Sequence, residues 1–510
     1  MNKMKKTDFS ISVLFVVGII LVINFFSYKI LPFIRIDLTE TKQYSISKIS
    51  KKTVGELDDI VNIKAYFSGN LPSQILSLKQ EVSDVLNEYE VFSNGKIRVE
   101  YIDPGTSEEM QRELYIAGIP QLTFEVFEKD KRQLVNGYFG IAVSYGDKIE
   151  AIPTIKREGA GLEYQLTTAI KKVISERIAT IGVVSSNKTA NLENEISTAY
   201  ESLQELYTVN QIEIKADAEI PVNIDTLLVI GPKESFSDEQ IKKMENFVNA
   251  GKSLILFVDG VRVEQGLVAN KNNTGINKLL NKYGFSLRDE LVADSRSGMA
   301  SFSQGFMRFS TPYPFWPKVT KEGFNQNEVS VSSLETVIFP WASSIDVTSA
   351  QDDKTYSNLA LTSSKSWTLS ENFNIVPNNI SAPSGDIKER VLAISVSGKA
   401  NYDNVENKKD VFKGKIILVG DSDFILDNFL QQNPDNLTFF QNIVDSISLD
   451  NDLIAIRSKV VSSRPIKEDL SDGAKSAMRY VNVFGVTLVV VVFGMARYYA
   501  RRKSKFVDEL

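Results

Sequence analysis

Two long apolar segments, one near each end of the chain, constrain its fold most. They cover Phe9–Leu31 and Met478–Ala496. A helix rises about 1.5 Å per residue, so either segment is long enough to cross the ~30 Å hydrocarbon layer of a membrane. The whole chain is 43% apolar and 24% charged, which is normal for a globular protein. We therefore expect folded domains between two transmembrane helices, at residues 9–31 and 478–496.

The basic residues beside these segments predict their orientation. Lysines precede the first segment and a basic cluster follows the second: Lys3, Lys5, Lys6, Arg497, Arg501, Arg502, Lys503 and Lys505. Positive charge favours the cytoplasmic side, so we expect both tails, residues 1–8 and 497–510, to be cytoplasmic. The rest would lie outside a bacterial inner membrane. The alternatives are a cleaved signal peptide for the first segment and a buried core helix for the second.

The chain contains no cysteine and no histidine. This excludes disulfides, thiolate nucleophiles, Cys-ligated metals and every mechanism that needs an imidazole. The net charge of −6 argues against a nucleic-acid-binding surface. Any chemistry would depend on carboxylates, Lys, Tyr, Ser or an oxygen-ligated metal ion. These exclusions favour binding or assembly over catalysis, and we expect no catalytic residues and no cofactor.

Residues 32–160 are predicted to form a first α/β unit. Ser47 is a candidate cap for a helix that follows the first apolar segment. Strands are expected over Val61–Phe67, Ile97–Ile102, Leu122–Phe127, Gly137–Ser144 and Lys148–Ile152, and helices over Ser73–Phe92 and Glu108–Ala117. The order β-α-β-α-β-β is typical of a thioredoxin-like unit. Because the redox CxxC motif is absent, only the fold could be shared.

A connecting helix at 161–177 leads to a second unit at 178–465. Here the expected strands are Ile178–Val184, Thr226–Ile230, Ser253–Val258, Val391–Val396 and Ile416–Val419, and the expected helices are Asn191–Leu206, Ser237–Ala250 and Leu437–Ser448. Nearly continuous apolar strands are typical of a parallel sheet covered on both faces, so we predict a doubly wound, flavodoxin-like domain. It would carry a β-rich insertion at 266–386. A linker at 466–477 follows.

Acidic residues follow two of the apolar strands. Asp421 and Asp423 come directly after the strand KIILV, and Asp259 ends the strand at 254–259. The carboxyl ends of parallel strands are the usual ligand side of such sheets, and a hard cation could use two carboxylates there. We favour the alternative, in which these residues satisfy backbone amides in turns. We therefore predict no metal site, with Asp421 and Asp423 as the candidates if one exists.

A phosphate-binding loop is not expected. Gly251-Lys252-Ser253 resembles the end of a P-loop, but position 246 is Asn246 instead of the required glycine. The triplet also precedes a strand, whereas a P-loop follows one and opens a helix. We interpret Gly251 as a helix stop.

Aromatic residues crowd one segment of the insertion. They include Phe306, Phe309, Tyr313, Phe315 and Trp316, and the segment ends in Tyr-Pro-Phe-Trp-Pro. Exposed aromatics beside prolines would suit a partner surface. The alternative, which we slightly favour, is a minor core between the insertion and the sheet.

Several stretches resemble one family in their combined order. They are RIDLTETKQYSIS, IKAYFSGNLP with VEYIDP, LEYQLTTAIKKV, DTLLVIGPKESFSDEQIKKMENFVNAGKSLILFVDG, YPFWP and GKIILVGDSDFI. The chain is thus similar to the gliding-motility-associated ABC transporter auxiliary family (GldG-like proteins). The resemblance implies a membrane-anchored extracytoplasmic subunit that works with an ABC permease and a separate ATPase. It also implies that the second unit has a class I glutamine amidotransferase-like fold. Without Cys and His, amidase activity does not carry over.

The leading hypothesis is a non-enzymatic, substrate-binding-like auxiliary subunit of an ABC-type transport system in the bacterial envelope. Its outer domains would face the periplasm and present a surface to envelope cargo. Two alternatives stay open. One is a scaffold without a ligand. The other is a glycan-acting enzyme that would use Asp259, Asp421 and Asp423, since glycosidases need two carboxyls about 5–10 Å apart across a cleft.

Overall fold

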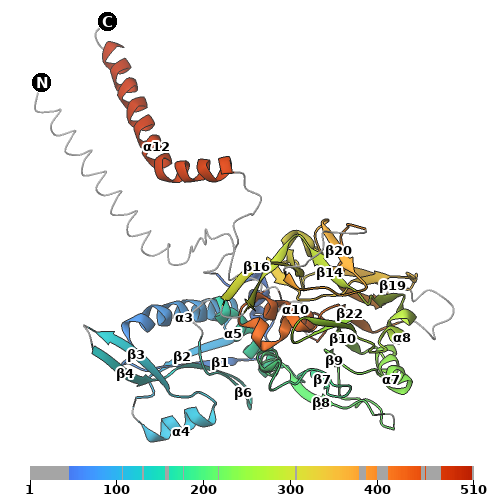
Figure 1. The fold of residues 1–510 in the computed structure, drawn as a ribbon. Helices are drawn as coiled ribbons and strands as arrows, with labels where there is room; N and C mark the ends of the chain where they lie inside the picture. Colours follow the sequence, from blue (N-terminus) through green and yellow to red (C-terminus); the bar gives the residue numbers. More distant parts are fainter. Residues whose placement is uncertain are drawn as a thin grey trace, which may run out of the picture. The chain divides into compact units, whose positions relative to one another are not determined.

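The structure is a computed structural model. It shows a mixed α/β protein, as the sequence predicted (Figure 1). It describes residues 45–105, 107–128, 131–155, 160–175, 177–215, 217–304, 307–377, 386–398, 412–448, 454, 456 and 472–507. The chain divides into two units, Met1–Val461 and Ser462–Leu510, and each is described by itself.

The first sheet of the larger unit has four strands in the order β2-β1-β5-β6. These strands are β1 (Val61–Phe67), β2 (Ile97–Ile102), β5 (Phe139–Tyr145) and β6 (Lys148–Ile152). β1 and β2 are parallel, whereas β5 and β6 are antiparallel to their neighbours. Helices α2 (Lys48–Gly55), α3 (Ser73–Phe92) and α5 (Ala160–Ile174) share one hydrophobic core with the sheet. Alternation along β1 buries Val61, Ile63 and Ala65 in that core.

Two elements complete this part of the chain. Helix α4 (Glu108–Ile116) begins at Ser107, whose hydroxyl accepts a hydrogen bond from the Met110 amide at 3.4 Å. β3 (Leu122–Glu128) and β4 (Lys131–Gly137) form a separate hairpin. We did not predict β4, because its sequence KRQLVNG lacks the apolar alternation of a half-buried strand.

The second sheet contains five adjacent parallel strands in the order β22-β10-β9-β7-β8. They are β7 (Thr180–Val184), β8 (Thr208–Ile212), β9 (Thr226–Ile230), β10 (Ser253–Phe257) and β22 (Lys415–Val419). β21 (Val391–Gly398) pairs antiparallel with β22. β13 (Phe285–Leu287), β18 (Ile345–Val347) and β19 (Lys354–Leu361) extend the sheet beyond β21.

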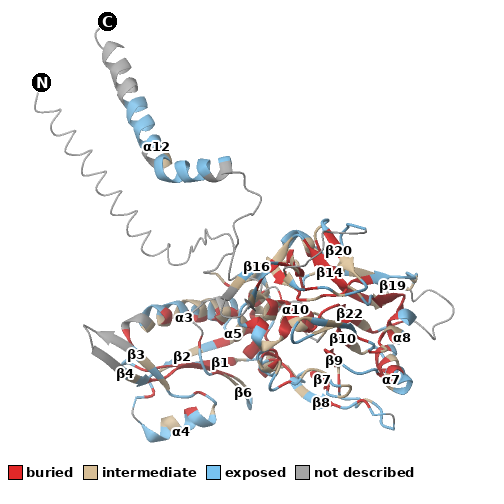
Figure 2. Ribbon diagram, viewed as in Figure 1, coloured by how far each residue is buried: buried red, intermediate tan, exposed pale blue. Residues whose placement is uncertain are grey.

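Both faces of this sheet are covered, as its apolar strands predicted. Successive residues of β9, such as Leu227 and Leu228, point to opposite faces of the sheet and belong to two different cores. One core includes α6 (Ser197–Gln204) and α10 (Asp435–Ser448), and the other includes α7 (Asp238–Asn249) and α8 (Asn277–Leu280). β9 is buried along its whole length, and β10 and β22 are nearly so (Figure 2). The site described below lies at the carboxyl ends of these strands.

The segment 266–386 is rich in β structure, as expected, but several of its strands join the main sheet. β18 and β19 each pair with β21 of the main sheet, and β13 pairs with β18. The other strands of this segment are β12 (Val268–Lys271), β14 (Leu291–Asp294), β15 (Ser297–Gln304), β16 (Met307–Thr320), β17 (Thr336–Ile338) and β20 (Ser366–Leu369). β11 (Val261–Glu264) lies just before the segment and pairs with β12. The inserted segment is therefore built into the domain.

Two predictions about the second sheet were wrong in detail. The helix expected over Asn191–Leu206 begins only at Ser197, because the Asn191 carboxamide accepts hydrogen bonds from the amides of Glu193 and Asn194 and holds a turn there. β8 was not predicted. Its sequence TVNQI is mostly polar, since it is an edge strand with little burial.

The smaller unit contains α12 (Asp472–Val507), which includes the second apolar segment. The first, Phe9–Leu31, lies outside the described residues. No single helix in the described ranges is long and apolar enough to cross a membrane. The segments Ser476–Gly485 and Leu488–Arg497 reach that length and composition only as a pair, with a bend of 47° between them. The single straight span predicted over residues 478–496 is therefore not found among the described residues, where two helical segments meet at a bend.

Candidate functional site

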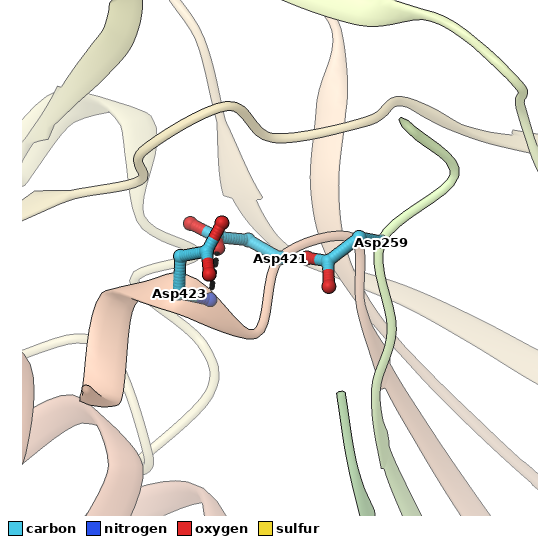
Figure 3. Close-up of side chains that lie close together, drawn as sticks. All are labelled: Asp259, Asp421 and Asp423. Carbon is cyan, nitrogen blue, oxygen red and sulfur yellow. Dashed lines mark hydrogen bonds between the residues drawn. The ribbon is translucent and has the colours of Figure 1, made fainter. Parts of the chain in front are cut away.

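Three carboxylates meet where β10 and β22 end. The two strands are parallel neighbours with Phe257 opposite Val419, so the positions two residues further on, Asp259 and Asp421, reach the same edge of the sheet. Asp423 begins the short 3₁₀ helix η6 (Asp423–Ile425). One carboxylate oxygen from each aspartate lies within 4.8 Å of the others (Figure 3). The sequence indicated these residues at two separate strand ends, and the fold brings them together.

The hydrogen bonds of this cluster are unequal. Asp259 has both oxygens occupied, since Oδ1 accepts from the Ser422 amide at 2.7 Å and Oδ2 from the Ser422 hydroxyl at 2.5 Å. Asp421 Oδ1 accepts from the amides of Asp423 at 2.7 Å and Phe424 at 3.3 Å. Asp421 Oδ2 is buried and has no hydrogen-bonding partner among the described residues. The alternative in which these residues only satisfy groups in turns therefore accounts for both oxygens of Asp259 and for Oδ1 of Asp421. It does not account for Oδ2 of Asp421.

Residues from the inserted region hold the two strand ends in place. Ser343 joins them, because its hydroxyl accepts from the Gly260 amide at 3.0 Å and its amide donates to the Gly420 carbonyl at 2.7 Å. A Cβ atom on Gly420 would lie 2.1 Å from the Ser343 carbonyl oxygen, so this approach requires glycine. Asn272 donates to the Asp259 carbonyl at 3.0 Å. Sequence reasoning missed Ser343 and Asn272; the local signal near them was one glycine beside Asp259 and one beside Asp421.

Burial and mutual repulsion disfavour ionisation of the cluster. Burial raises the pKa of Asp421 well above its usual value, and the carboxylates of Asp423 and Asp259 raise it further. Burial also raises the pKa of Asp423, with Asp259 adding to the effect. The pKa of Asp259 is raised by burial as well, although the hydrogen bonds from Ser422 act in the opposite direction. Asp421 is 0% exposed and Asp259 7% exposed, so water screens these charges poorly.

One nearby cation is already engaged. The charge of Lys233 lowers the pKa values of Asp259 and Asp423. Its ammonium group, however, lies 3.3 Å from Glu195 Oε1, and its side chain is 42% exposed. A solvated ion pair of this kind gives little net charge to its surroundings. Lys233 therefore does not neutralise three carboxylates.

A polar cavity of about 270 Å³ lies at the carboxyl end of β7. Its lining includes Ser185, Thr189, Asn191 and Gln211. None of the three aspartates belongs to this lining. The cluster is therefore a buried site and not the floor of this cavity.

The geometry does not match that of a glycosidase. The three aspartates are packed together with oxygens within 4.8 Å, and two of them are tied to backbone amides. A glycosidase instead holds two carboxyls about 5–10 Å apart across an open cleft. The observed arrangement can neutralise a cation or share protons, and Asp421 is too deeply buried to contact a sugar directly.

The aromatic residues of the insertion are distributed between core and surface. Tyr313 and Phe315 are buried in a core with Trp367, and the Tyr313 hydroxyl donates to the Ile375 carbonyl at 2.7 Å. Phe309 and Trp316 are half-buried. Trp316 makes edge-on contacts with Trp341 and with Phe429 of α9 (Asp427–Leu430). Phe306 lies outside the described residues. The burial of Tyr313 and Phe315 agrees with the packing alternative, and a partner surface on this segment stays a prediction.

The doubly covered sheet and the acidic cluster at its carboxyl ends both lie in the region that matches a known family. The family model, described as an ABC-type uncharacterized transport system, matches residues 179–449, more than half of the chain. The chain belongs to this family, whose members are auxiliary components of an ABC-type transport system. The auxiliary-family part of the predicted resemblance is thereby confirmed. A domain of unknown function (DUF7088) matches residues 40–144.

One relative covers nearly the whole chain. It is an uncharacterized protein of Borreliella burgdorferi, 24% identical over 496 residues, or 92% of this chain and 94% of that protein. Among solved structures, the mmIFT52 N-terminal domain aligns with 53% of this chain and 98% of its own, at 14% identity and a TM-score of 0.36. An exo-beta-1,4-mannosidase from an Opitutaceae bacterium aligns with 57% of this chain and 40% of its own, at 8% identity and a TM-score of 0.25. Neither structural likeness is close enough to carry an argument.

Proposed function

We propose that this protein is a non-catalytic accessory subunit of an ABC-type transport system that works with a separate permease and a separate ATPase. The observation that carries the proposal is the family match over residues 179–449. The sequence supports the division of labour, because it has no complete phosphate-binding loop of its own. The absence of Cys and His supports the non-catalytic assignment. Nucleic acid is not among the proposed partners.

The proposal includes anchoring in a bacterial inner membrane by two spans, with both termini cytoplasmic and the remaining residues in the periplasm. Supporting observations come from α12. Many of its apolar side chains are exposed in the isolated chain, and Val489 and Phe493 are each 67% exposed. A helix that exposes so much apolar surface needs lipid or a partner helix to cover it. The basic residues after Ala496 support a cytoplasmic carboxyl terminus.

The proposed domain organisation has a thioredoxin-like unit at 32–160 and a flavodoxin-like or amidotransferase-like unit at 178–465, joined by residues 161–177. The strand order β22-β10-β9-β7-β8 supports the flavodoxin-like part. If these five strands are numbered 1 to 5 along the chain, the order is 5-4-3-1-2, which read from the other edge of the sheet is the flavodoxin-like order 2-1-3-4-5. The order β2-β1-β5-β6, with its single parallel pair, supports the thioredoxin-like part. A role in gliding motility rests on the resemblance of the quoted segments alone.

Copurification tests the proposal. The full-length chain, tagged at its amino terminus, would be extracted from its native host in a mild detergent and captured, and its partners identified by mass spectrometry. We expect an ABC permease and an ATPase in amounts comparable to the chain itself. An unrelated tagged membrane protein of similar abundance serves as the control. Recovery of neither a permease nor an ATPase, from membranes that contain both, would contradict the proposal.

A matched pair of variants sharpens this experiment. Val489→Asp places a charge on the exposed apolar surface of α12, and Val222→Asp places one at a loop position that is 88% exposed. An aspartate at the centre of a membrane-spanning helix costs about 2.5–3.5 kcal/mol, so we expect Val489→Asp to reduce recovery of the permease several-fold. Val222→Asp should leave the recovery unchanged. Equal recovery with both variants would remove α12 from the proposed interface.

A further inference from the structure

We propose that Asp259, Asp421 and Asp423 bind a hard divalent cation of the size of Ca²⁺. The cluster lies where β10 and β22 end (Figure 3). The inference goes beyond the proposed transport role and does not depend on it, because a cation here would act on the fold of this chain whichever partners it has.

The first argument is the unpartnered oxygen of Asp421. The residue is 0% exposed, and Oδ2 has no hydrogen-bonding partner among the described residues, although Oδ1 of the same carboxylate has two. Leaving a buried carboxylate oxygen without a partner is costly, by about 1–3 kcal/mol or more for a charged group. The two amides on Oδ1 oppose the burial and repulsion that disfavour ionisation, and a bound cation would favour the ionised form further. A cation would give Oδ2 a partner and would balance the negative charge of the carboxylate.

The second argument is the balance of charge. Three carboxylates converge, and the Lys233 ammonium that acts on them is shared with Glu195 at 3.3 Å and partly solvated. Like charges this close cannot all stay ionised in a poorly screened site unless a counter-charge is present. A divalent cation would neutralise most of the charge of the cluster. Buried charges in proteins are generally paired or bind metals.

The third argument is size. Ca²⁺–oxygen distances of 2.3–2.6 Å allow ligand oxygens on opposite sides of the ion to be about 4.6–5.2 Å apart, whereas Mg²⁺ requires about 4.0–4.2 Å. One oxygen from each of the three aspartates lies within 4.8 Å of the other two, a separation that the ligands of a Ca²⁺ ion can span. Both ions prefer carboxylate oxygens. The absence of His and Cys therefore does not weaken the site.

The surrounding residues hold these ligands in position. Ser422 binds both oxygens of Asp259 and so orients its carboxylate beside the turn that carries Asp421. Ser343 ties the Gly260 and Gly420 backbones together. The ligands thus belong to strand ends that are already fixed, and little ordering is required when the ion binds. A bound cation would add a further link between β10 and β22.

Thermal unfolding of the purified full-length chain in detergent tests the proposal. Three conditions are compared: a chelator, 5 mM CaCl₂ and 5 mM MgCl₂. We expect Ca²⁺ to raise the melting temperature by about 3–5 °C if its concentration is some hundred-fold above the dissociation constant. Mg²⁺ should raise it less. Identical melting in the chelator and in both salts would overturn the proposal, and a larger rise with Mg²⁺ would overturn the assignment by size.

Variants separate this site from other cation effects. Asp421→Asn and Asp423→Asn keep the side-chain size and remove a ligand charge, so each should abolish the Ca²⁺-dependent rise. The matched control is Asp294→Asn, because Asp294 is also 0% exposed but receives hydrogen bonds on both oxygens. Its Ca²⁺-dependent rise should persist, whatever its basal stability. A full rise retained by both cluster variants would place the cation elsewhere and overturn the proposal.

Discussion

Two buried strand ends, one in the inserted region and one in the main sheet, show how similar aspartates take on different roles. Asp294 ends β14 and Asp421 follows β22, and both are 0% exposed. Asp294 Oδ1 accepts from the Arg296 amide at 2.9 Å and the Ser363 hydroxyl at 2.5 Å, and Oδ2 accepts from the Ser363 amide at 2.7 Å. Among the described residues, Asp421 has donors on one oxygen only. Burial alone therefore does not distinguish a structural carboxylate from a ligand; the unfilled oxygen does.

The largest expected effect comes from breaking the satisfied site. Asp294→Asn keeps one acceptor oxygen but turns an amide group toward donors that need an acceptor. Hydrogen bonds to a buried charge contribute about 1.5–3 kcal/mol each, and an unsatisfied donor adds a penalty. We expect a loss of about 3 kcal/mol in the free energy of unfolding, measured by urea denaturation. A loss below about 1 kcal/mol would mean that these hydrogen bonds do not hold the inserted region in place.

An intermediate effect is expected at a third aspartate, which is satisfied but only partly buried. Asp427 accepts from the Ser197 amide and hydroxyl, both at 2.8 Å, and from the Thr198 amide at 2.9 Å, and so it caps the start of α6 from α9. Asp427→Ala should cost about 1–2 kcal/mol in the free energy of unfolding, as for other helix caps. Asp427→Asn, which keeps an acceptor, should cost less. Equal losses for the two variants would argue against a capping role.

The same residue predicts a pH dependence. Burial raises the pKa of Asp427, but the hydrogen bonds from Thr198 and Ser197 outweigh that effect and lower the pKa overall. A carboxyl group whose pKa is lower in the folded state stabilises the protein above its unfolded pKa of about 4, and this contribution is lost as the pH falls through the folded value. Wild type should therefore lose more stability than Asp427→Ala on acidification below pH 4. Parallel stability curves for the two proteins would contradict this.

The smallest effect on basal stability is expected at the unsatisfied site. In a chelator, Asp421→Asn removes repulsion from Asp259 and Asp423 while its carboxamide oxygen can still accept from the Asp423 and Phe424 amides. We expect a change of less than about 1 kcal/mol in the free energy of unfolding, in either direction. A loss as large as that for Asp294→Asn would show that Asp421 is a structural carboxylate and would remove the contrast between the two strand ends.

The sequence was sufficient for the parts of the fold that local patterns determine. The bounds of α3, β1, β2, β6 and β9 agree with those predicted, because apolar spacing and turn residues mark them clearly. Ser237 caps α7 as expected, and Gly251 follows that helix with a φ of +88°, which suits a helix stop. β4 and β8 were missed because polar strands at an edge or in an isolated hairpin carry no apolar signal.

The candidate site was predictable only in part. Asp421 and Asp423 were candidates because they follow an apolar strand, and Asp259 because it ends another. That the two strands are neighbours depends on the sheet order, which no local pattern encodes. Ser343 reaches the site from 77 positions upstream of Gly420 (420 − 343), and only the folded chain shows its two hydrogen bonds. The unpartnered Oδ2 is an atomic feature that the sequence does not contain.

Direct measurement of bound cation is the decisive experiment on the contrast between Asp421 and Asp294. Equilibrium dialysis of the full-length chain against radioactive calcium, in detergent and after chelator treatment, gives the number of ions bound per chain. We expect one Ca²⁺ per chain for wild type and for Asp294→Asn, and none at this site for Asp421→Asn. Equal binding by wild type and Asp421→Asn, or none by wild type at millimolar calcium, would contradict the assignment of the three aspartates as a cation site.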